Sequence, residues 1–189
     1  MKDKSIGIAY LDNKLDICRG ILDKHGNFYS VTLFNSERKI AGEASFVNKD
    51  DRTILNYLYC MQKYRKMGVG QALIDIVETC ASNKSKAITG IYVPFQETYD
   101  LEVFGRDTKL KINTRKFYTK NHYAIVKFNN DIITNYQNIR YSDFIYDDVT
   151  MDEIIFKTTK GIQKRFEYLG DILFDKNIYE MKSKTYLKH

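Results

Sequence analysis

The sequence is poor in the two residue types that bind transition metals most often. Its 189 residues include only three histidines and three cysteines. Because zinc sites are built from clusters of cysteine and histidine side chains, we expect no metal centre. The cysteines are odd in number, widely spaced and without a Cys-x-x-Cys pair; they are Cys18, Cys60 and Cys80. All three lie in apolar patterns, so we predict reduced thiols in a protein core, as is usual in the cytoplasm.

Long apolar segments are also missing. The chain has no run of 18 or more apolar residues, which predicts no membrane-spanning helix. The polar start, Met-Lys-Asp-Lys-Ser, lacks the apolar centre of a signal peptide, so we expect a cytoplasmic protein. Hydrophobic residues make up 43% of the chain and aromatic residues 14%, which indicates a globular protein rather than a disordered one. At this length, residues 1–189 are expected to form a single domain.

The net charge of +6 is unevenly distributed along the chain. Residues 106–127 hold seven Lys or Arg side chains against a single acid, whereas residues 143–153 hold five acids and no Lys or Arg. A basic segment of this kind suits a phosphate-bearing ligand or a nucleic acid. A solvated charged face explains the same pattern equally well.

Apolar spacing in the first sixty residues predicts one helix and then three antiparallel strands. Leu11, Leu15, Cys18 and Leu22 recur every three to four residues, which favours a helix over residues 10–24. Residues 28–34 and 40–47 have the composition of a strand hairpin with a turn at 35–38. Residues 53–61 are expected to form the third strand.

The chain is organised around residues 62–71, which read Gln-Lys-Tyr-Arg-Lys-Met-Gly-Val-Gly-Gln. Glycines here allow a tight turn and a close approach to backbone N–H groups. An amphipathic helix follows, with one apolar stripe that consists of Val69, Ala72, Leu73, Ile76, Val77 and Cys80. A glycine turn at a helix N-terminus can bind a pyrophosphate, although an ordinary strand-to-helix turn has the same pattern.

Beyond this helix we expect alternating strands and short helices. Residues 87–93 form a strand that a right-handed crossover makes parallel to residues 53–61. A long polar connection over 95–112 precedes a short helix capped by Asn113 and extending to Asn121. Strands are predicted at 123–128 and 154–158. The last expected helix rests on the spacing of Ile162, Phe166, Leu169 and Leu173.

Two motifs together resemble the GNAT superfamily of acetyl-CoA-dependent N-acyltransferases. The first is Arg65-x-x-Gly68-x-Gly70, which is similar to the family's pyrophosphate loop. The second, in residues 116–123, reads Lys-Phe-Tyr-Thr-Lys-Asn-His-Tyr and looks like the family motif Phe-Tyr-x-Lys-x-Gly-Phe. The resemblance covers residues 28–128, and the pattern over 130–189 is weaker. It implies an α/β fold whose mixed, mostly antiparallel sheet is splayed at the acetyl-CoA site and flanked by helices.

The resemblance also implies an activity, namely acetyl transfer from acetyl-CoA to a primary amine of a small molecule or a protein, without a metal. The implied general acid is Tyr118. The implied cofactor-binding residues are Leu58, Tyr59, Cys60, Arg65, Lys66, Met67, Gly68, Val69, Gly70 and Gln71. For the general base the sequence leaves open Glu43, Glu97, Asp100, Glu102, His122 and a chain of waters.

The sequence departs from the family pattern at several positions, including Gln62 in place of a common proline and Arg106 where several members place a base. His122 stands where the family usually has glycine, and histidine is among the residues that tolerate unusual backbone conformations. Lys111 stands where many members carry an asparagine that contacts CoA. These departures keep a second hypothesis open, in which the chain is an inactive acetyl-CoA sensor or interaction module.

The remaining partners follow from the same reasoning. No nucleic-acid motif accompanies the basic segment, and CoA phosphates account for its charge more economically than tRNA or DNA. We expect acetyl-CoA and an amine acceptor as partners, no membrane, and either a monomer or a homodimer.

Overall fold

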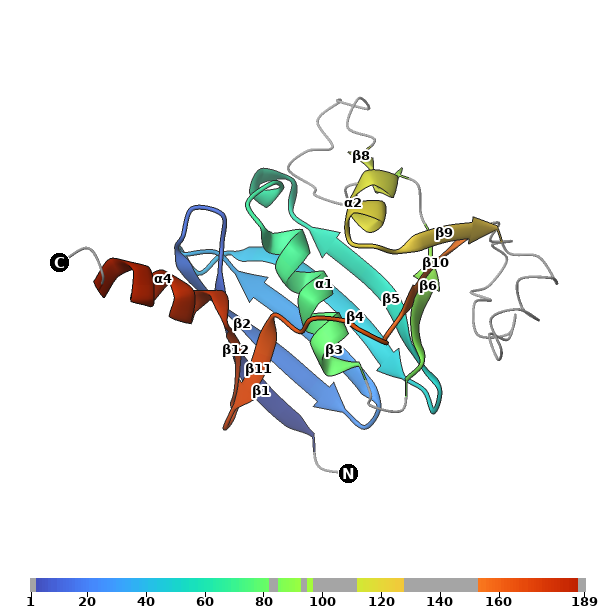
Figure 1. Ribbon diagram of the computed structural model, residues 1–189, viewed down its shortest axis with the longest axis horizontal. Coiled ribbons are helices and arrows are strands. Elements are labelled where there is room, and N and C mark those ends of the chain that lie inside the picture. The colour runs from blue at the N-terminus through green and yellow to red at the C-terminus, as the bar shows by residue number, and fades with distance from the viewer. Residues whose placement is uncertain (1–2, 82–84, 93–94, 97–111, 128–152, 187–189) are drawn as a thin grey trace.

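A computed structural model describes residues 3–81, 85–92, 95–96, 112–127 and 153–186. Its centre is a ten-stranded sheet in the order β11-β12-β1-β2-β3-β4-β5-β6-β10-β9 (Figure 1). The strands are β1 (Lys4–Leu11), β2 (Ile17–His25), β3 (Phe28–Phe34), β4 (Ile40–Asn48), β5 (Arg52–Cys60), β6 (Ala87–Ile91), β9 (Ala124–Lys127), β10 (Glu153–Thr158), β11 (Phe166–Leu169) and β12 (Ile172–Asp175). The expected mixed, mostly antiparallel sheet is confirmed, since the pairs β1–β12 and β5–β6 are parallel and the other seven are antiparallel.

The helical elements are few among the described residues. They are the 3-10 turn η1 (Gln62–Tyr64), α1 (Val69–Cys80), α2 (Arg115–Lys120) and α4 (Asn177–Tyr186). None of these helices is long and apolar enough to cross a membrane. A two-stranded sheet of β7 (Phe95–Gln96) and β8 (Ile112–Asn113) pairs the ends of the predicted long connection. Residues 97–111, which include Glu97, Asp100 and Glu102, lie outside the described part.

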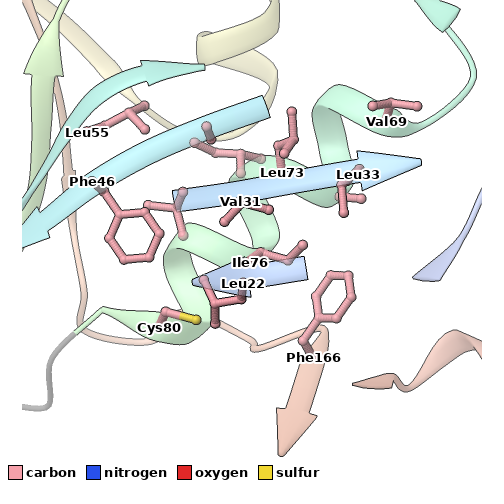
Figure 2. Close-up of a cluster of buried hydrophobic side chains, with 14 of the residues drawn as sticks. Leu22, Val31, Leu33, Phe46, Leu55, Val69, Leu73, Ile76, Cys80 and Phe166 are labelled. Atoms are coloured by element: carbon pink, nitrogen blue, oxygen red, sulfur yellow. The ribbon is translucent and has the colours of Figure 1, made fainter. Parts of the chain in front are cut away.

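The hydrophobic core lies between α1 and one face of the sheet. The apolar stripe predicted for α1 is confirmed: Leu73, Ile76 and Val77 are fully buried. Figure 2 shows Leu73 and Ile76 of α1 against side chains of the sheet, with Val31, Leu33 and Phe46 among those labelled. The three cysteines are also buried and free, as expected.

The helix predicted over residues 10–24 is wrong, because this segment forms the hairpin of β1 and β2. In β2, the buried Cys18 and Leu22 lie on one face, and the exposed Ile17 and Ile21 lie on the other. This alternation has the period of a strand. Leu15, which completed the helical spacing, sits in the turn with a φ of 66° and is 62% exposed.

The helix predicted from Ile162, Phe166, Leu169 and Leu173 is also wrong. Phe166 and Leu173 are buried in the neighbouring strands β11 and β12, whereas Leu169 is exposed. Gly170, with a φ of 58°, makes the turn between them, a conformation that would end any helix. β12 then pairs in parallel with β1 and extends the sheet beyond the N-terminal strand.

Asn113 does not cap α2, contrary to the prediction. Asn113 belongs to β8 and pairs with Phe95 of β7. Thr114 is the N-cap residue of α2, without a side-chain cap hydrogen bond. The other predicted strands are confirmed within one or two residues at their described ends. The parallel pairing of residues 53–61 with 87–93 is confirmed from Arg52 to Leu55.

A partly buried ionic network joins the C-terminal hairpin to the rest of the core. The Arg165 guanidinium donates to Asp75 Oδ2 of α1 at 3.1 Å and to Asp175 Oδ2 of β12. It also donates to the Leu11 carbonyl at the end of β1 at 2.8 Å. Asp175 is fully buried, and its carboxylate also accepts the Leu11 N–H at 2.9 Å. One cation therefore connects α1, β12 and β1.

Replacement of Arg165 by methionine should strongly destabilise the fold. The change leaves the buried Asp175 and the half-buried Asp75 without their cation. Removal of one partner from a buried ion pair typically costs about 3–5 kcal/mol in free energy of unfolding. Urea denaturation measures this loss. Arg19→Met is the matched control, because Arg19 is exposed on β2. Equal stability of the two variants would contradict a structural role for the network.

Candidate functional site

The sheet is interrupted between β5 and β6, two strands whose residues are all described. Their parallel ladder runs from Arg52↔Ala87 to Leu55↔Gly90 and stops there. β5 nevertheless continues to Cys60, where it still pairs with Gly42 of β4. The C-terminal half of β5 thus follows β4 alone, and the sheet divides at this point. Leu58, Tyr59 and Cys60, predicted as cofactor-binding residues, lie in this half.

The glycine loop follows directly from the divided end of β5. Lys66 has a φ of 62° and Gly68 a φ of 86°, so two left-handed residues flank Met67, which is not left-handed. Alternating backbone hands of this kind point successive N–H groups toward one side, where they can bind an anion. α1 begins at Val69, and its first-turn amides have no acceptor within the helix. The loop and helix end therefore offer several N–H donors and the positive end of the helix dipole.

The cations of the loop differ in their surroundings. The Arg65 Nε donates to the Cys60 carbonyl at 3.1 Å, so this side chain folds back on the end of β5. Lys63 lies over the Tyr64 ring at 5.2 Å from its centre, and Lys66 is exposed. Arg65 thus links the divided strand to the loop. Lys66 is exposed, and its ammonium can reach an incoming anion.

Cys60 lacks the properties of a nucleophile. Burial raises the pKa of its thiol to about 11, although Arg65 and the Gly70 N–H both act to lower it. A thiol with this pKa is protonated near neutral pH, and only the thiolate is reactive. Cys60 therefore packs in the core with its side chain, and its carbonyl accepts the Arg65 hydrogen bond.

Tyr118, the predicted acid, lies on α2 within a cluster of aromatic side chains. Its ring makes edge contacts with Phe117, Tyr123 and Tyr92, at centroid distances of 5.3, 5.9 and 6.3 Å. It is 9% exposed. Burial raises the pKa of Tyr118 to about 12, with a smaller contribution from Tyr92, so the phenol keeps its proton throughout the physiological pH range.

Two contacts join α2 to the N-terminal turn of α1. The Phe117 ring lies 3.4 Å from the position of a Cβ on Gly70, so glycine allows the two helices to approach closely. The Gln71 Nε2 donates to the Asn121 Oδ1 at 2.6 Å. Asn121 in turn donates to the Phe117 carbonyl at 2.9 Å and accepts from Lys157 at 2.9 Å. These bonds hold the helix that carries Tyr118 against the helix that follows the glycine loop.

His122 adopts the left-handed conformation that glycine would adopt at this position, with a φ of 62°. This turn directs the chain from α2 into β9. Among the candidate bases, His122 is exposed, and Glu43 lies on β4 directly opposite Tyr59. Neither one has a contact that assigns it as the base.

The sequence reasoning missed Asn13, which contacts the glycine loop from the β1–β2 turn. Its Nδ2 donates to the Lys66 carbonyl at 2.9 Å, and its N–H donates to the Met67 carbonyl at 3.1 Å. The expected helix over residues 10–24 concealed this turn. The Asp-Asn pair at 12–13 is typical of turns and was the signal available.

Gly68→Ala should cost more stability than Gly26→Ala, although both glycines have positive φ values. A Cβ on Gly68 would lie 2.7 Å from the Asn13 Oδ1, whereas one on Gly26 has nothing within 4 Å. Gly26→Ala therefore measures backbone strain alone, about 1–2 kcal/mol. Gly68→Ala adds displacement of Asn13, and urea denaturation gives both values. Equal losses would show that Asn13 moves aside freely.

Comparison with known proteins gives similar folds at low sequence identity. A GNAT-family acetyltransferase from Staphylococcus aureus Mu50 is 15% identical over 71% of this chain and 69% of its own, with a TM-score of 0.45. An aminoglycoside 6′-N-acetyltransferase complexed with coenzyme A is 14% identical over 74% and 77%, with a TM-score of 0.44. A GNAT-family acetyltransferase from Elizabethkingia anophelis with acetyl-CoA bound is 15% identical over 75% and 74%, with a TM-score of 0.38. No protein-family model and no curated protein matches the sequence. The structural neighbours of this chain thus include GNAT acetyltransferases.

Proposed function

We propose that this protein transfers the acetyl group of acetyl-CoA to the primary amine of an acceptor. One observation carries the proposal: the sheet divides beside β5 immediately before a loop suited to a pyrophosphate, and a buried tyrosine is held against the same helix end. Acetyl-CoA would need these three features side by side: a strand edge for its thioester arm, a loop for its pyrophosphate and an acid for its sulfur.

The loop amides would bind the pyrophosphate of acetyl-CoA. The N–H groups of Gly68, Val69 and Gln71 lie where the alternating backbone hands meet the helix end, and both features favour an anion. The exposed Lys66 ammonium adds an opposite charge. The pantetheine arm would then run along the last three residues of β5, Leu58 to Cys60, and make strand-like backbone contacts there.

The reaction needs a neutral amine, because a protonated one has no lone pair for the attack. Its nitrogen adds to the thioester carbonyl carbon, and the carbon–sulfur bond then breaks. The amine releases one proton to a base or to water, and the departing sulfur gains one, so the protons balance. Tyr118 would donate a hydrogen bond and then a proton to the sulfur as negative charge develops on it. Its pKa of about 12 keeps this proton in place until the charge appears.

Acetyl-CoA should raise the melting temperature of the protein, because a ligand that binds only the folded state stabilises it. Gly68→Asp should abolish this shift by adding bulk and negative charge at the phosphates. Gly26→Asp is the matched control, because Gly26 also has a positive φ, with nothing within 4 Å of its Cβ position. Differential scanning fluorimetry measures all three proteins. A folded Gly68→Asp protein that keeps the full shift would remove the loop from the binding site.

Tyr118→Phe should lower turnover by about 10²–10⁴-fold, the usual contribution of an acid or base, and should leave acetyl-CoA affinity unchanged. Thiol release with a panel of amines, amino acids, peptides and aminoglycosides measures turnover and also searches for the acceptor. Tyr123→Phe is the control, because Tyr123 is buried in the same aromatic cluster. Equal losses in both variants would indicate disturbed packing, and full activity of Tyr118→Phe would exclude this residue as the acid.

A further inference from the structure

The turn between β1 and β2 contacts the glycine loop at the loop's backbone carbonyls. Asn13 contributes both polar groups that reach the loop, the side-chain Nδ2 to the Lys66 carbonyl and the backbone N–H to the Met67 carbonyl. Fifty-three residues separate Asn13 from Lys66 in the sequence. Figure 1 shows this turn beside the segment that leads into α1. We propose that Asn13 is a positioning residue that holds the loop in its anion-binding conformation, an inference that rests on the proposed function.

The two carbonyls that Asn13 holds belong to the residues that define the loop's conformation. Lys66 is left-handed without being glycine, a state that costs about 1–2 kcal/mol for an ordinary side chain. A bond to its carbonyl compensates part of that cost. The Met67 N–H donates to the Tyr64 carbonyl at 3.3 Å. Because a peptide carbonyl and the following N–H point in opposite directions, fixing the Met67 carbonyl also directs the Gly68 N–H to the other side. That side is where the pyrophosphate would bind.

The turn is rigid enough to act in this way. The Asp12 carboxylate is buried and accepts the N–H groups of Lys14 and Asp16 at 2.8 and 2.9 Å, which closes the turn around Asn13. The Leu11 N–H and carbonyl are held by Asp175 and Arg165, respectively. Asn13 therefore projects from a backbone that is fixed on both sides.

The same network aligns the turn with the helix that follows the loop. Arg165 bonds both to the Leu11 carbonyl and to Asp75, which lies on α1 beyond the loop. The loop is thus held at its carbonyls by Asn13 and at its helix by Asp75, and both supports meet at one guanidinium. Gly68 fits this arrangement, because a side chain there would meet the Asn13 Oδ1.

The test compares two acetyl donors, acetyl-CoA and acetyl-pantetheine, which lacks the pyrophosphate. Asn13→Ala removes the side-chain donor, and Asn13→Asp keeps the shape but replaces the donor by a carboxylate. Asn27→Ala is the matched control, because Asn27 is an exposed asparagine in the turn after β2. CoA affinity is measured by isothermal titration calorimetry, and kcat/KM is measured with each donor.

We expect both Asn13 variants to bind CoA about tenfold more weakly, as the loss of one ordered hydrogen bond predicts. Their KM for acetyl-CoA should rise with kcat nearly unchanged, and kcat/KM with acetyl-pantetheine should stay at the wild-type value. Unchanged CoA affinity in both variants would overturn the role of Asn13. Equal losses with both donors would overturn it as well, since a general structural defect does not distinguish them. If the wild-type protein itself binds no CoA, the proposed function fails, and this inference fails with it.

Discussion

The half-buried guanidinium of Arg165 is the interaction on which the arrangement of the site depends. Its partners belong to three segments that are distant in the sequence, namely α1, β12 and the end of β1. Burial raises the pKa of Asp75, even though Gln71 and Arg165 both donate to its carboxylate. Gln71 and Arg165 thus both favour the charged form of Asp75 against this burial. Arg165 joins α1 to β12 and to the end of β1.

The position of α1 determines the rest of the candidate site. Gly42 allows the helix to lie close to β4, because a Cβ there would meet Val69 and Leu73 within 3.0 Å. The N-terminus of α1 is thereby held beside the divided end of β5. Arg65, in the loop between them, donates to the carbonyl of Cys60 at the end of β5. The same helix end contacts α2, which carries Tyr118: Gln71 donates to Asn121, and Gly70 lies against the Phe117 ring. A single helix end thus orders both the candidate anion site and the candidate acid.

The sequence predicted those parts of the fold where local pattern and tertiary environment agree. The strands around 28–34 and 40–47, the glycine loop and α1 combine clear periodicity with turn residues at their ends. The two wrong helix predictions have a common cause. Leu15 and Leu169 completed an apolar spacing of three to four residues, yet both are exposed and lie in or beside turns. An apolar residue at an exposed turn cannot be told from a core residue by spacing alone, so the hairpins of β1–β2 and β11–β12 were missed.

The candidate site divides in the same way. Residues on one continuous segment, from Leu58 to Gln71, could be identified because their order along the chain is also their order in space. Tyr118 could be identified only through the resemblance of its motif. Asn13 and the pair formed by Gln71 and Asn121 depend on which distant segments meet, and local patterns contain no such information.

The parallel pairing of β12 with β1 has a consequence for how the chain folds. The Leu11 N–H donates to the Asp175 carboxylate, and 164 residues separate the two in the sequence, so this contact closes a very long loop. Such contacts are entropically expensive and tend to form late. During synthesis, β1 emerges long before β12 and keeps an unpaired edge until β12 has been made. An open edge strand can pair with other chains, and the later pairing of β12 therefore protects β1 from aggregation.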